Sequence, residues 1–225
     1  MFAVPAAAGD EDGWVRVAEQ EGGVLIFSRP HPGSDVQELR VVAIVHEPAS
    51  VLRNVINDVT HYTELIPYTT RSTLLERDGD RIAVERIELP MLAPREYVVT
   101  FTTATHATAD GRHTFVTSWK NAPPKYQLLL TARDAVRVID NTGSWSFEEL
   151  GDNETRATFE MAVDPAGDVP SALVNVAQRA SLPRYVENLR VRARLPQYRC
   201  LLDDPHGASK RSTSVRMPGV PSAAM

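Results

Sequence analysis

Apolar and polar residues alternate along short stretches of the first third of the chain, as in half-buried β-strands. These stretches are Trp14–Ala18, Val24–Arg29 and Gln37–His46. A helix is expected to begin near Pro48, because proline suits the first turn of a helix and a helical spacing of apolar residues follows. That spacing predicts a helix that packs on one side only, through Val51, Leu52, Val55, Ile56 and Val59.

The strand pattern returns at Thr69 and continues to Val163. Asp78-Gly79-Asp80 and Asp110-Gly111 mark hairpin turns, and a proline-bounded apolar segment, Leu89–Pro94, interrupts the series. The predicted strands are Thr69–Glu76, Arg81–Leu89, Arg95–Thr105, His113–Trp119, Ala135–Asp140, Ser144–Glu149 and Thr155–Val163.

A long helix is expected to follow the last strand. Asp168 is a suitable N-cap, and the apolar spacing continues to about Leu195. Pro183 lies inside this segment and is expected to bend or break the helix. The order of elements predicts an α+β domain in which a curved antiparallel sheet carries helices on one face. Such a layout can leave a pocket between sheet and helix.

The chain divides into three expected segments. These are an N-terminal extension at 1–13, one domain at 14–200, and a disordered tail at 201–225 that is rich in Ser, Pro and Gly without periodicity. Met1–Ala8 is too short for a signal peptide, yet Pro5–Gly9 has the small residues that end one. The sequence as written favours the cytoplasm, and a start further upstream would favour export.

The amino-acid composition and net charge argue against several classes of protein function. The chain has 225 residues, 43% hydrophobic and 24% charged, which is typical of a soluble globular protein with a sizeable core. A net charge of −5 argues against a nucleic-acid binder. The single cysteine, Cys200, excludes an internal disulfide and a cysteine-rich zinc site. No apolar run has the length of a membrane-spanning helix.

The C-terminal end of the chain is basic although the whole chain is acidic. Residues 184–225 hold eight Lys or Arg against three Asp or Glu. This pattern fits a solvated helix face followed by a tail, or a surface that meets anionic lipid headgroups.

Patterns for catalysis or metal binding are sparse. None of the six histidines has the spacing of a metal site. The motifs of serine hydrolases, P-loops and dinucleotide-binding folds are absent from the sequence. We therefore predict no metal, no cofactor and no catalytic residue. One alternative stays open, in which Tyr97 and His113 face one pocket as a general acid/base pair.

Several stretches stand in an order that resembles a known family. They are Trp14 with Gly23–Arg29, Asp58-Val59 with Tyr62, Ile87–Pro90, Pro94–Tyr97, Gly143–Phe147 and Asp164–Pro170. In this order and spacing, over roughly residues 14–197, the chain resembles the START domain family. That family belongs to the helix-grip superfamily of lipid-transfer proteins and polyketide cyclases.

The resemblance implies a helix-grip fold with a deep apolar cavity under the terminal helix. It implies that the protein binds one lipid, sterol or quinone-like molecule and carries or presents it without catalysis; a polyketide cyclase or aromatase is the alternative. Asp58–Pro67 is similar to the coenzyme Q-binding branch, which keeps a quinone among the ligand classes. Where some members place a buried acidic and basic pair, the alignment puts Ile82 and Phe101. Glu96 stands where the family has Asp.

Strand alternation and the family's layout together predict the residues that line the cavity. They are Tyr62, Ile82, Val84, Leu92, Tyr97, Val99, Phe101, Phe115, Thr117, Trp119, Leu173, Val176 and Ala177. The alternative is that these residues simply fill a solid core, in which case the basic helix would bind a partner.

The Leu89–Pro94 loop is expected to gate the cavity and to touch membranes weakly and reversibly. The expected lid and membrane contacts are Pro90, Met91, Leu92, Arg190 and Arg194. Arg95 is expected to form a structural ion pair at the start of its strand, or else to anchor a ligand. We expect a monomer that makes transient contact with a membrane surface and binds no nucleic acid.

Overall fold

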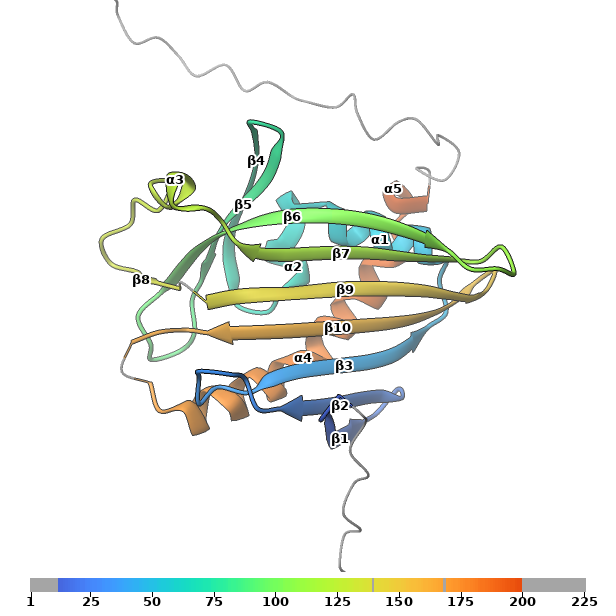
Figure 1. Ribbon diagram of the computed structural model, residues 1–225, viewed down its shortest axis with the longest axis horizontal. Helices are drawn as coiled ribbons and strands as arrows, with labels where there is room; N and C mark the ends of the chain where they lie inside the picture. The colour runs from blue at the N-terminus through green and yellow to red at the C-terminus, as the bar shows by residue number, and fades with distance from the viewer. Residues whose placement is uncertain (1–11, 139, 168, 200–225) are drawn as a thin grey trace, which may run out of the picture.

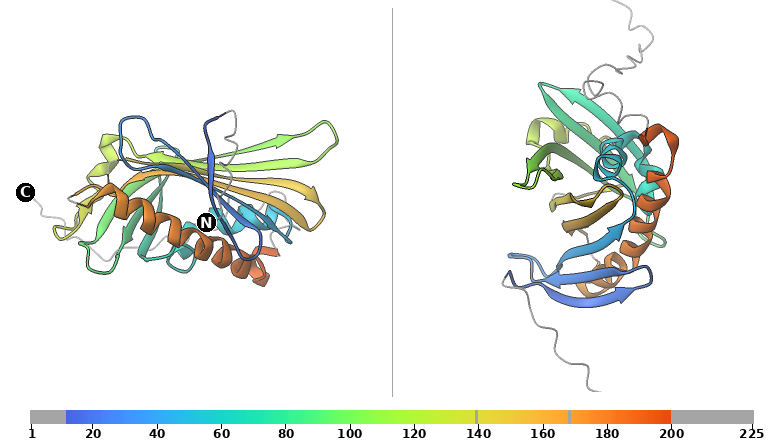
Figure 2. Two further views of the ribbon diagram at one scale, coloured as in Figure 1. Left: turned by 90° about the horizontal axis from the view of Figure 1, so that it is seen from below. Right: turned by 90° about the vertical axis from the view of Figure 1, so that its right-hand side faces the viewer.

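The computed structural model describes residues 12–138, 140–167 and 169–199. Its strands form one ten-stranded sheet in the order β1-β2-β3-β10-β9-β7-β6-β5-β4, with β8 beside β6. The sheet is curved, and the helices α1 and α4 lie on its concave side (Figures 1 and 2). The predicted α+β helix-grip architecture is confirmed. The expected tail, 201–225, and most of the expected extension lie outside the described residues.

The strands and helices have the following bounds. The strands are β1 (Val15–Gln20), β2 (Val24–Arg29), β3 (Glu38–Val45), β4 (Thr69–Arg77), β5 (Asp80–Ile87), β6 (Arg95–Ala107), β7 (His113–Asn121), β8 (Val136–Arg137), β9 (Asp140–Gly151) and β10 (Glu154–Asp164). The helices are α1 (Ala49–Asn57), the 3-10 turn η1 (Val59–His61), α2 (Tyr62–Leu65), α3 (Pro124–Gln127), α4 (Ser171–Ala193) and α5 (Pro196–Arg199).

Two strands differ from the sequence prediction. The expected strand Ala135–Asp140 shrinks to the two residues of β8, which pair with β6 in parallel. β9 begins at Asp140, opposite Asp164 of β10, rather than at Ser144. The Asn-Thr-Gly sequence that reads as a turn is part of the strand.

Helix α4 continues through Pro183 instead of breaking there. Proline removes one backbone donor, but Leu182, Tyr185 and Val186 are all buried against the sheet and α1 beside it. This packing keeps the helix continuous. Its expected N-cap, residue 168, lies outside the described residues.

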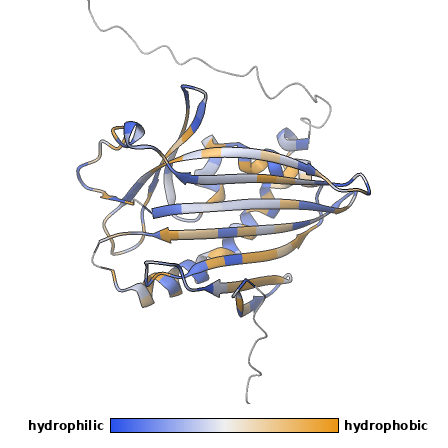
Figure 3. Cartoon of the chain, in the orientation of Figure 1, coloured by the Kyte–Doolittle hydropathy of each residue, from blue (hydrophilic) through white to orange (hydrophobic). Residues whose placement is uncertain are grey.

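Apolar and polar residues alternate along the strands (Figure 3). The buried apolar residues form two clusters. The larger cluster fills the space between the concave face of the sheet, α1 and α4. The smaller one lies on the opposite face, where the segment around α3 covers β5 and β6. Because α4 closes the concave side, the space beneath it is where the expected ligand would lie.

Candidate functional site

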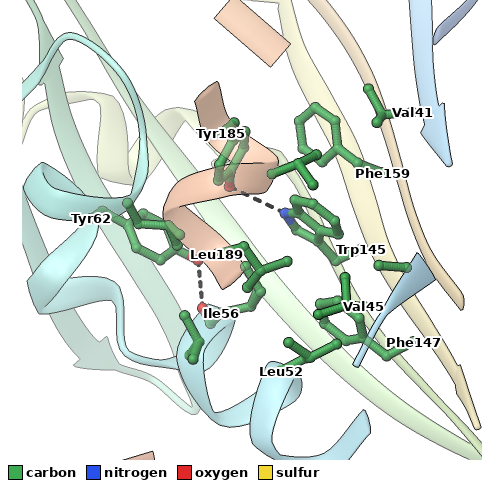
Figure 4. Packing of buried hydrophobic residues seen from close by; sticks show 14 of the residues in the cluster. Val41, Val45, Leu52, Ile56, Tyr62, Trp145, Phe147, Phe159, Tyr185 and Leu189 are labelled. Atoms are coloured by element: carbon green, nitrogen blue, oxygen red, sulfur yellow. Dashed lines mark hydrogen bonds between the residues drawn. The ribbon is translucent and has the colours of Figure 1, made fainter. Parts of the chain in front are cut away.

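The interior beneath α4 is built around three aromatic rings. The ring centroids of Trp145 and Phe159 are 4.8 Å apart, and the Tyr185 ring meets both edge-on at 5.3 and 5.1 Å. Trp145 Nε1 donates a hydrogen bond to Tyr185 Oη at 3.2 Å (Figure 4). This contact ties α4 to β9, and each polar atom of the pair is satisfied inside an apolar environment.

A buried carboxyl group lies in the same interior. Glu85 of β5 is opposite Tyr97 of β6, and Tyr97 Oη donates to Glu85 Oε2 at 2.7 Å. Both residues are buried, Glu85 with 1% of its surface exposed. Burial raises the pKa of Glu85 to about 7, although the Tyr97 hydrogen bond acts in the opposite direction. Near neutral pH this group therefore exchanges between a carboxylic acid and a carboxylate.

The tyrosines around Glu85 are neutral phenols. Burial raises the pKa of Tyr62, Tyr97 and Tyr185 above the ordinary value for tyrosine. Tyr62 Oη donates to the Ile56 carbonyl at 2.6 Å (Figure 4). The interior is thus apolar with a few paired polar groups, which is the chemistry of a site for an amphiphile.

Seven of the predicted lining residues face this interior. They are Tyr62, Tyr97, Val99, Phe101, Phe115, Thr117 and Trp119. Trp119 stacks on Phe159 with centroids 5.8 Å apart. Its ring passes directly over Gly143, where an added Cβ would lie within 3.0 Å of it.

Ile82 and Val84 lie on the wrong face for the predicted lining. The pairs Ala83↔Val99 and Glu85↔Tyr97 place the odd-numbered residues of β5 inside. Ile82 and Val84 consequently pack in the smaller cluster, under the α3 segment. Because that segment covers the outer face of β5, apolar residues are buried on both faces of this strand. Hydropathy alone therefore assigned Ile82 and Val84 to the wrong face.

The predicted lining residues of α4 and the gating loop are also misplaced. Leu173 and Val176 are 62% and 65% exposed, and Ala177 and Leu92 are exposed as well. The buried face of α4 instead consists of Val174, Leu182, Tyr185, Val186, Leu189, Arg192 and Ala193.

Side chains fill the expected cavity in this conformation. The two best-defined depressions among the described residues lie elsewhere, one beside Trp14 on β7, β9 and β10 and one at the β4–β5 turn. A ligand of lipid size would therefore have to separate α4 from the sheet or displace side chains between them.

The C-terminal end of α4 is anchored by buried polar groups that the sequence reading missed. Arg192, 4% exposed, hydrogen-bonds the Tyr198 hydroxyl and pairs with Glu64. Tyr198 Oη donates to Asp58 Oδ2 at 2.9 Å. These contacts fasten α4 and α5 to η1 and α2, so this end of the helix is fixed.

The N-terminal half of α4 is held more weakly. Of residues 171–181 only Val174 is buried. Asn175 Oδ1 accepts from Gln37 N at 2.9 Å, and Gln178 Nε2 donates to Val163 O at 2.9 Å. Gln178 Oε1 and Arg179 Nε are buried without a hydrogen-bond partner among the described residues. Such atoms cost about 1–3 kcal/mol each, which makes this half the weaker one.

Arg95 is bound by carbonyl groups rather than in the predicted ion pair. Its guanidinium donates to Ala93 O at 2.5 Å and to Ala166 O at 3.5 Å. It thereby joins the Leu89–Pro94 loop to the connection that leads into α4. Met91, in that loop, has φ +62° and is fully exposed.

The two expected contact arginines differ in their surroundings. Arg190 donates to the carbonyls of Gly22 and Ile44 at 2.8 and 3.1 Å, so it fastens α4 to the β1–β2 turn and to β3 instead of facing a membrane. Arg194 is exposed, as expected.

Tyr97 and His113 do not lie together, so the structure contains no acid/base pair of these two residues. His113 is exposed at the β6–β7 turn beside Glu149, whereas Tyr97 is buried near the other end of β6. No cluster of three or more potential metal ligands occurs among the described residues. None of the described helices combines the length and apolarity needed to cross a bilayer.

Comparison with known proteins places the chain in a family. The family model "Polyketide cyclase / dehydrase and lipid transport" matches residues 45–190, and the chain belongs to that family. An uncharacterised protein of Pseudomonas aeruginosa is 28% identical over 177 residues, which is 78% of this chain and 83% of that protein.

Solved structures confirm the START helix-grip fold. A STAR-related lipid transfer protein fragment from Xanthomonas axonopodis superposes with a TM-score of 0.67 at 24% identity, over 82% of this chain and all of that one. Human StAR-related lipid transfer protein 5 gives 0.69 at 18% identity, over 82% and 88% of the two chains.

Proposed function

We propose that this protein binds one lipid-like molecule between the sheet and α4, and carries or presents it without catalysis. The observation that carries the proposal is the buried apolar interior under α4, which contains a carboxyl group and is closed by a helix whose N-terminal half, residues 171–181, buries only Val174. The family's description, which includes lipid transport, and the lipid-transfer titles of the structural neighbours support it.

The polar pair in the interior indicates the chemistry of the ligand. The Tyr97 O–H is donated to Glu85 Oε2, so the Glu85 carboxyl is the group left for a ligand. Its protonated form offers one O–H, and its carboxylate form accepts hydrogen bonds. A ligand with one hydroxyl or carbonyl group on a large apolar body would satisfy them. Lipids, sterols and quinones share that chemistry.

Entry requires α4 to move, because the interior is filled. The N-terminal half of α4 can separate from the sheet at low cost, since it buries little apolar surface and covers unsatisfied polar atoms. Pro183, which cannot donate a backbone hydrogen bond, divides this half from the anchored C-terminal half. We infer that α4 lifts from its N-terminal end while Arg192 and Tyr198 keep the other end in place.

The loop beside that end supplies the membrane contact. Arg95 joins the Leu89–Pro94 loop to the connection that leads into α4. Met91 of the loop is fully exposed, and Leu173 and Val176 of α4 are exposed as well. Each such side chain gains roughly 1.5–3 kcal/mol when fully buried in an apolar phase. A few of them give weak, reversible attachment of a monomer, as a carrier requires.

A lipid-extraction experiment tests the proposal. The protein is incubated with vesicles that contain phospholipid, a sterol and ubiquinone, is separated from them, and is analysed for bound lipid. We expect one of the three classes in stoichiometric amount, and transfer of that class from donor to acceptor vesicles. Protein that emerges free of all three classes contradicts the proposal.

A cyclase-type enzyme remains the second candidate, because the family's description also names polyketide cyclases. Glu85, with a pKa near 7 beside a phenol, is the group in the described interior suited to acid–base chemistry. Turnover of an aromatic polyketide precursor that is lost in both Glu85→Gln and Tyr97→Phe would favour this candidate.

A further inference from the structure

The second half of β6 is an open edge of the sheet. β5 pairs with β6 only as far as Arg81, which lies opposite Phe101, whereas β7 continues to the hairpin turn. The six residues from Thr102 to Ala107 are all exposed. In Figure 1 the β4–β5 hairpin turns away and this half of β6 runs on with β7 alone. Figure 2 (left) shows the β6–β7 hairpin reaching the end of the molecule.

The strand pairing shows which backbone N–H and C=O groups point out of this edge. Val98 O accepts from Ala122 N, on the β7 side, so the even-numbered residues of β6 face β7. Because the direction alternates along an antiparallel strand, the odd-numbered ones face away from β7. The residues whose N–H and C=O lack a strand partner within the described part of the chain are Thr103, Thr105 and Ala107.

This edge lacks the usual protection against strand pairing. Proteins commonly guard exposed edges with charged residues or proline, and the outer strand β1 carries Arg16 and Glu19. The stretch Thr102–Ala107 contains only Thr, Ala and His. An extended segment can therefore add to β6 through backbone hydrogen bonds.

Positive charge lies beside the edge on the concave face. The Arg53 guanidinium of α1 lies 4.7 Å from the Phe115 ring centroid, and Phe115 is opposite Thr105. The Arg53 guanidinium donates a hydrogen bond to the neutral amide oxygen of Asn54, and it forms no ion pair with a described residue. Arg81, the second residue of β5, donates to the Asn57 carbonyl and likewise makes no ion pair in the described part of the chain.

We propose that an extended peptide with acidic side chains docks on β6 at Thr102–Ala107 as an added antiparallel strand. Its residues opposite Thr103 and Thr105 would direct their side chains to the concave face, toward Arg53. Carboxylates at these positions would supply the charge that the two arginines lack. This site lies on the sheet edge and does not depend on lipid binding.

A second copy of the chain fits the edge less well. Self-pairing would bring a second set of Arg53 and Arg81 to the same face, and like charges facing each other destabilise a pair of strands. Six residues also bury less surface than the roughly 800 Å² per partner that a stable dimer needs. The charge pattern therefore favours an acidic peptide over self-association.

Fluorescence anisotropy with labelled hexapeptides tests the proposal on the full chain. One peptide alternates valine with glutamate, and the matched control alternates valine with lysine. We expect the glutamate peptide to bind at least about tenfold more tightly at low salt. Arg53→Ala should remove most of that preference, and Arg53→Lys should restore much of it.

A proline variant tests the edge itself. Thr105→Pro removes an outward N–H and leaves the β6–β7 hydrogen bonds in place, so it should weaken binding about tenfold with unchanged circular dichroism. Should circular dichroism show misfolding, Thr105→Glu takes its place with the same expected loss, because its carboxylate would face the glutamates of the added strand. Binding that is unaffected by the edge variant, or no binding at 1 mM peptide, overturns the proposal. The proposal is also overturned if the wild-type chain forms a dimer, the edge variant is a monomer, and neither peptide binds.

Discussion

Tyr97 and Glu85 are cross-strand neighbours on β6 and β5, and the Tyr97 hydroxyl donates to the Glu85 carboxyl at 2.7 Å. The pair puts the carboxyl group inside the sheet, directly under the space that α4 closes. Its burial leaves the group half-protonated near neutral pH, with a pKa of about 7.

The first prediction concerns the pH dependence of stability. The pKa of Glu85 is raised from 4.5 when unfolded to about 7 when folded, so its favourable contribution is complete below pH 4.5 and is lost as the pH rises through 7. The loss amounts to about 3 kcal/mol. Glu85→Gln should remove this dependence, and urea unfolding at pH 5 and pH 8 measures it.

The exposed Glu154→Gln serves as the matched control and should keep the wild-type pH profile. Identical pH profiles for wild type and Glu85→Gln would contradict the burial argument.

A second prediction concerns Gly143, which lets the Trp119 ring lie against β9. An added methyl group would lie within 3.0 Å of that ring and of the Glu160 carbonyl oxygen. Gly143→Ala should lower the free energy of unfolding by about 1–3 kcal/mol. Gly151→Ala, whose Cβ meets nothing within 4 Å, should change it by less than about 0.5 kcal/mol. Equal effects in thermal or urea unfolding would refute this contact.

The third prediction concerns the anchor of α4. Tyr198→Phe removes the hydroxyl between Arg192 and Asp58 and leaves a buried guanidinium donor unpaired, at a cost of about 1–3 kcal/mol. Hydrogen exchange should accelerate at the C-terminal end of α4. Tyr68→Phe, at a residue 44% exposed, is the control. Unchanged exchange in Tyr198→Phe would mean that α4 is anchored elsewhere.

A fourth prediction addresses the gating loop. Replacing Met91 and Leu92 by aspartate together should reduce co-sedimentation with anionic vesicles about tenfold or more, because apolar burial is lost and negative charge is added. Val15→Asp, on the far strand β1 and 43% exposed, should leave co-sedimentation unchanged. If the two variants behave alike, the loop is not the contact.

The sequence predicted the architecture well, because periodicity reports which face of an element is buried. The alternation of Tyr97, Val99 and Phe101 correctly put them inside. The same rule failed on β5, where two faces are buried: Ile82 and Val84 pack outside under the α3 segment. Hydropathy cannot tell which of two buried faces is the inner one.

The polar groups of the site could not be placed from the sequence. Glu85 is opposite Tyr97, so both side chains lie on the inner face of the sheet. The register between β5 and β6 determines this pairing. Arg192 pairs with Glu64, which lies 128 residues away along the chain. The inner face of α4 was misassigned because Leu173 and Val176 precede the part of the helix that packs.

The most direct test of the account is native mass spectrometry after loading with lipid, with α4 free or locked. Gln37 N and Asn175 Oδ1 are 2.9 Å apart, so residues 37 and 175 are neighbours. Cysteines are placed at both positions, with Cys200→Ser, and the disulfide that fastens the N-terminal half of α4 to the sheet is verified by non-reducing electrophoresis before loading. We expect one ligand per chain in the wild type and in the reduced variant, and none in the oxidised variant. A wild-type chain that never carries a ligand, or an oxidised variant that loads like the reduced one, would contradict an interior that opens under α4.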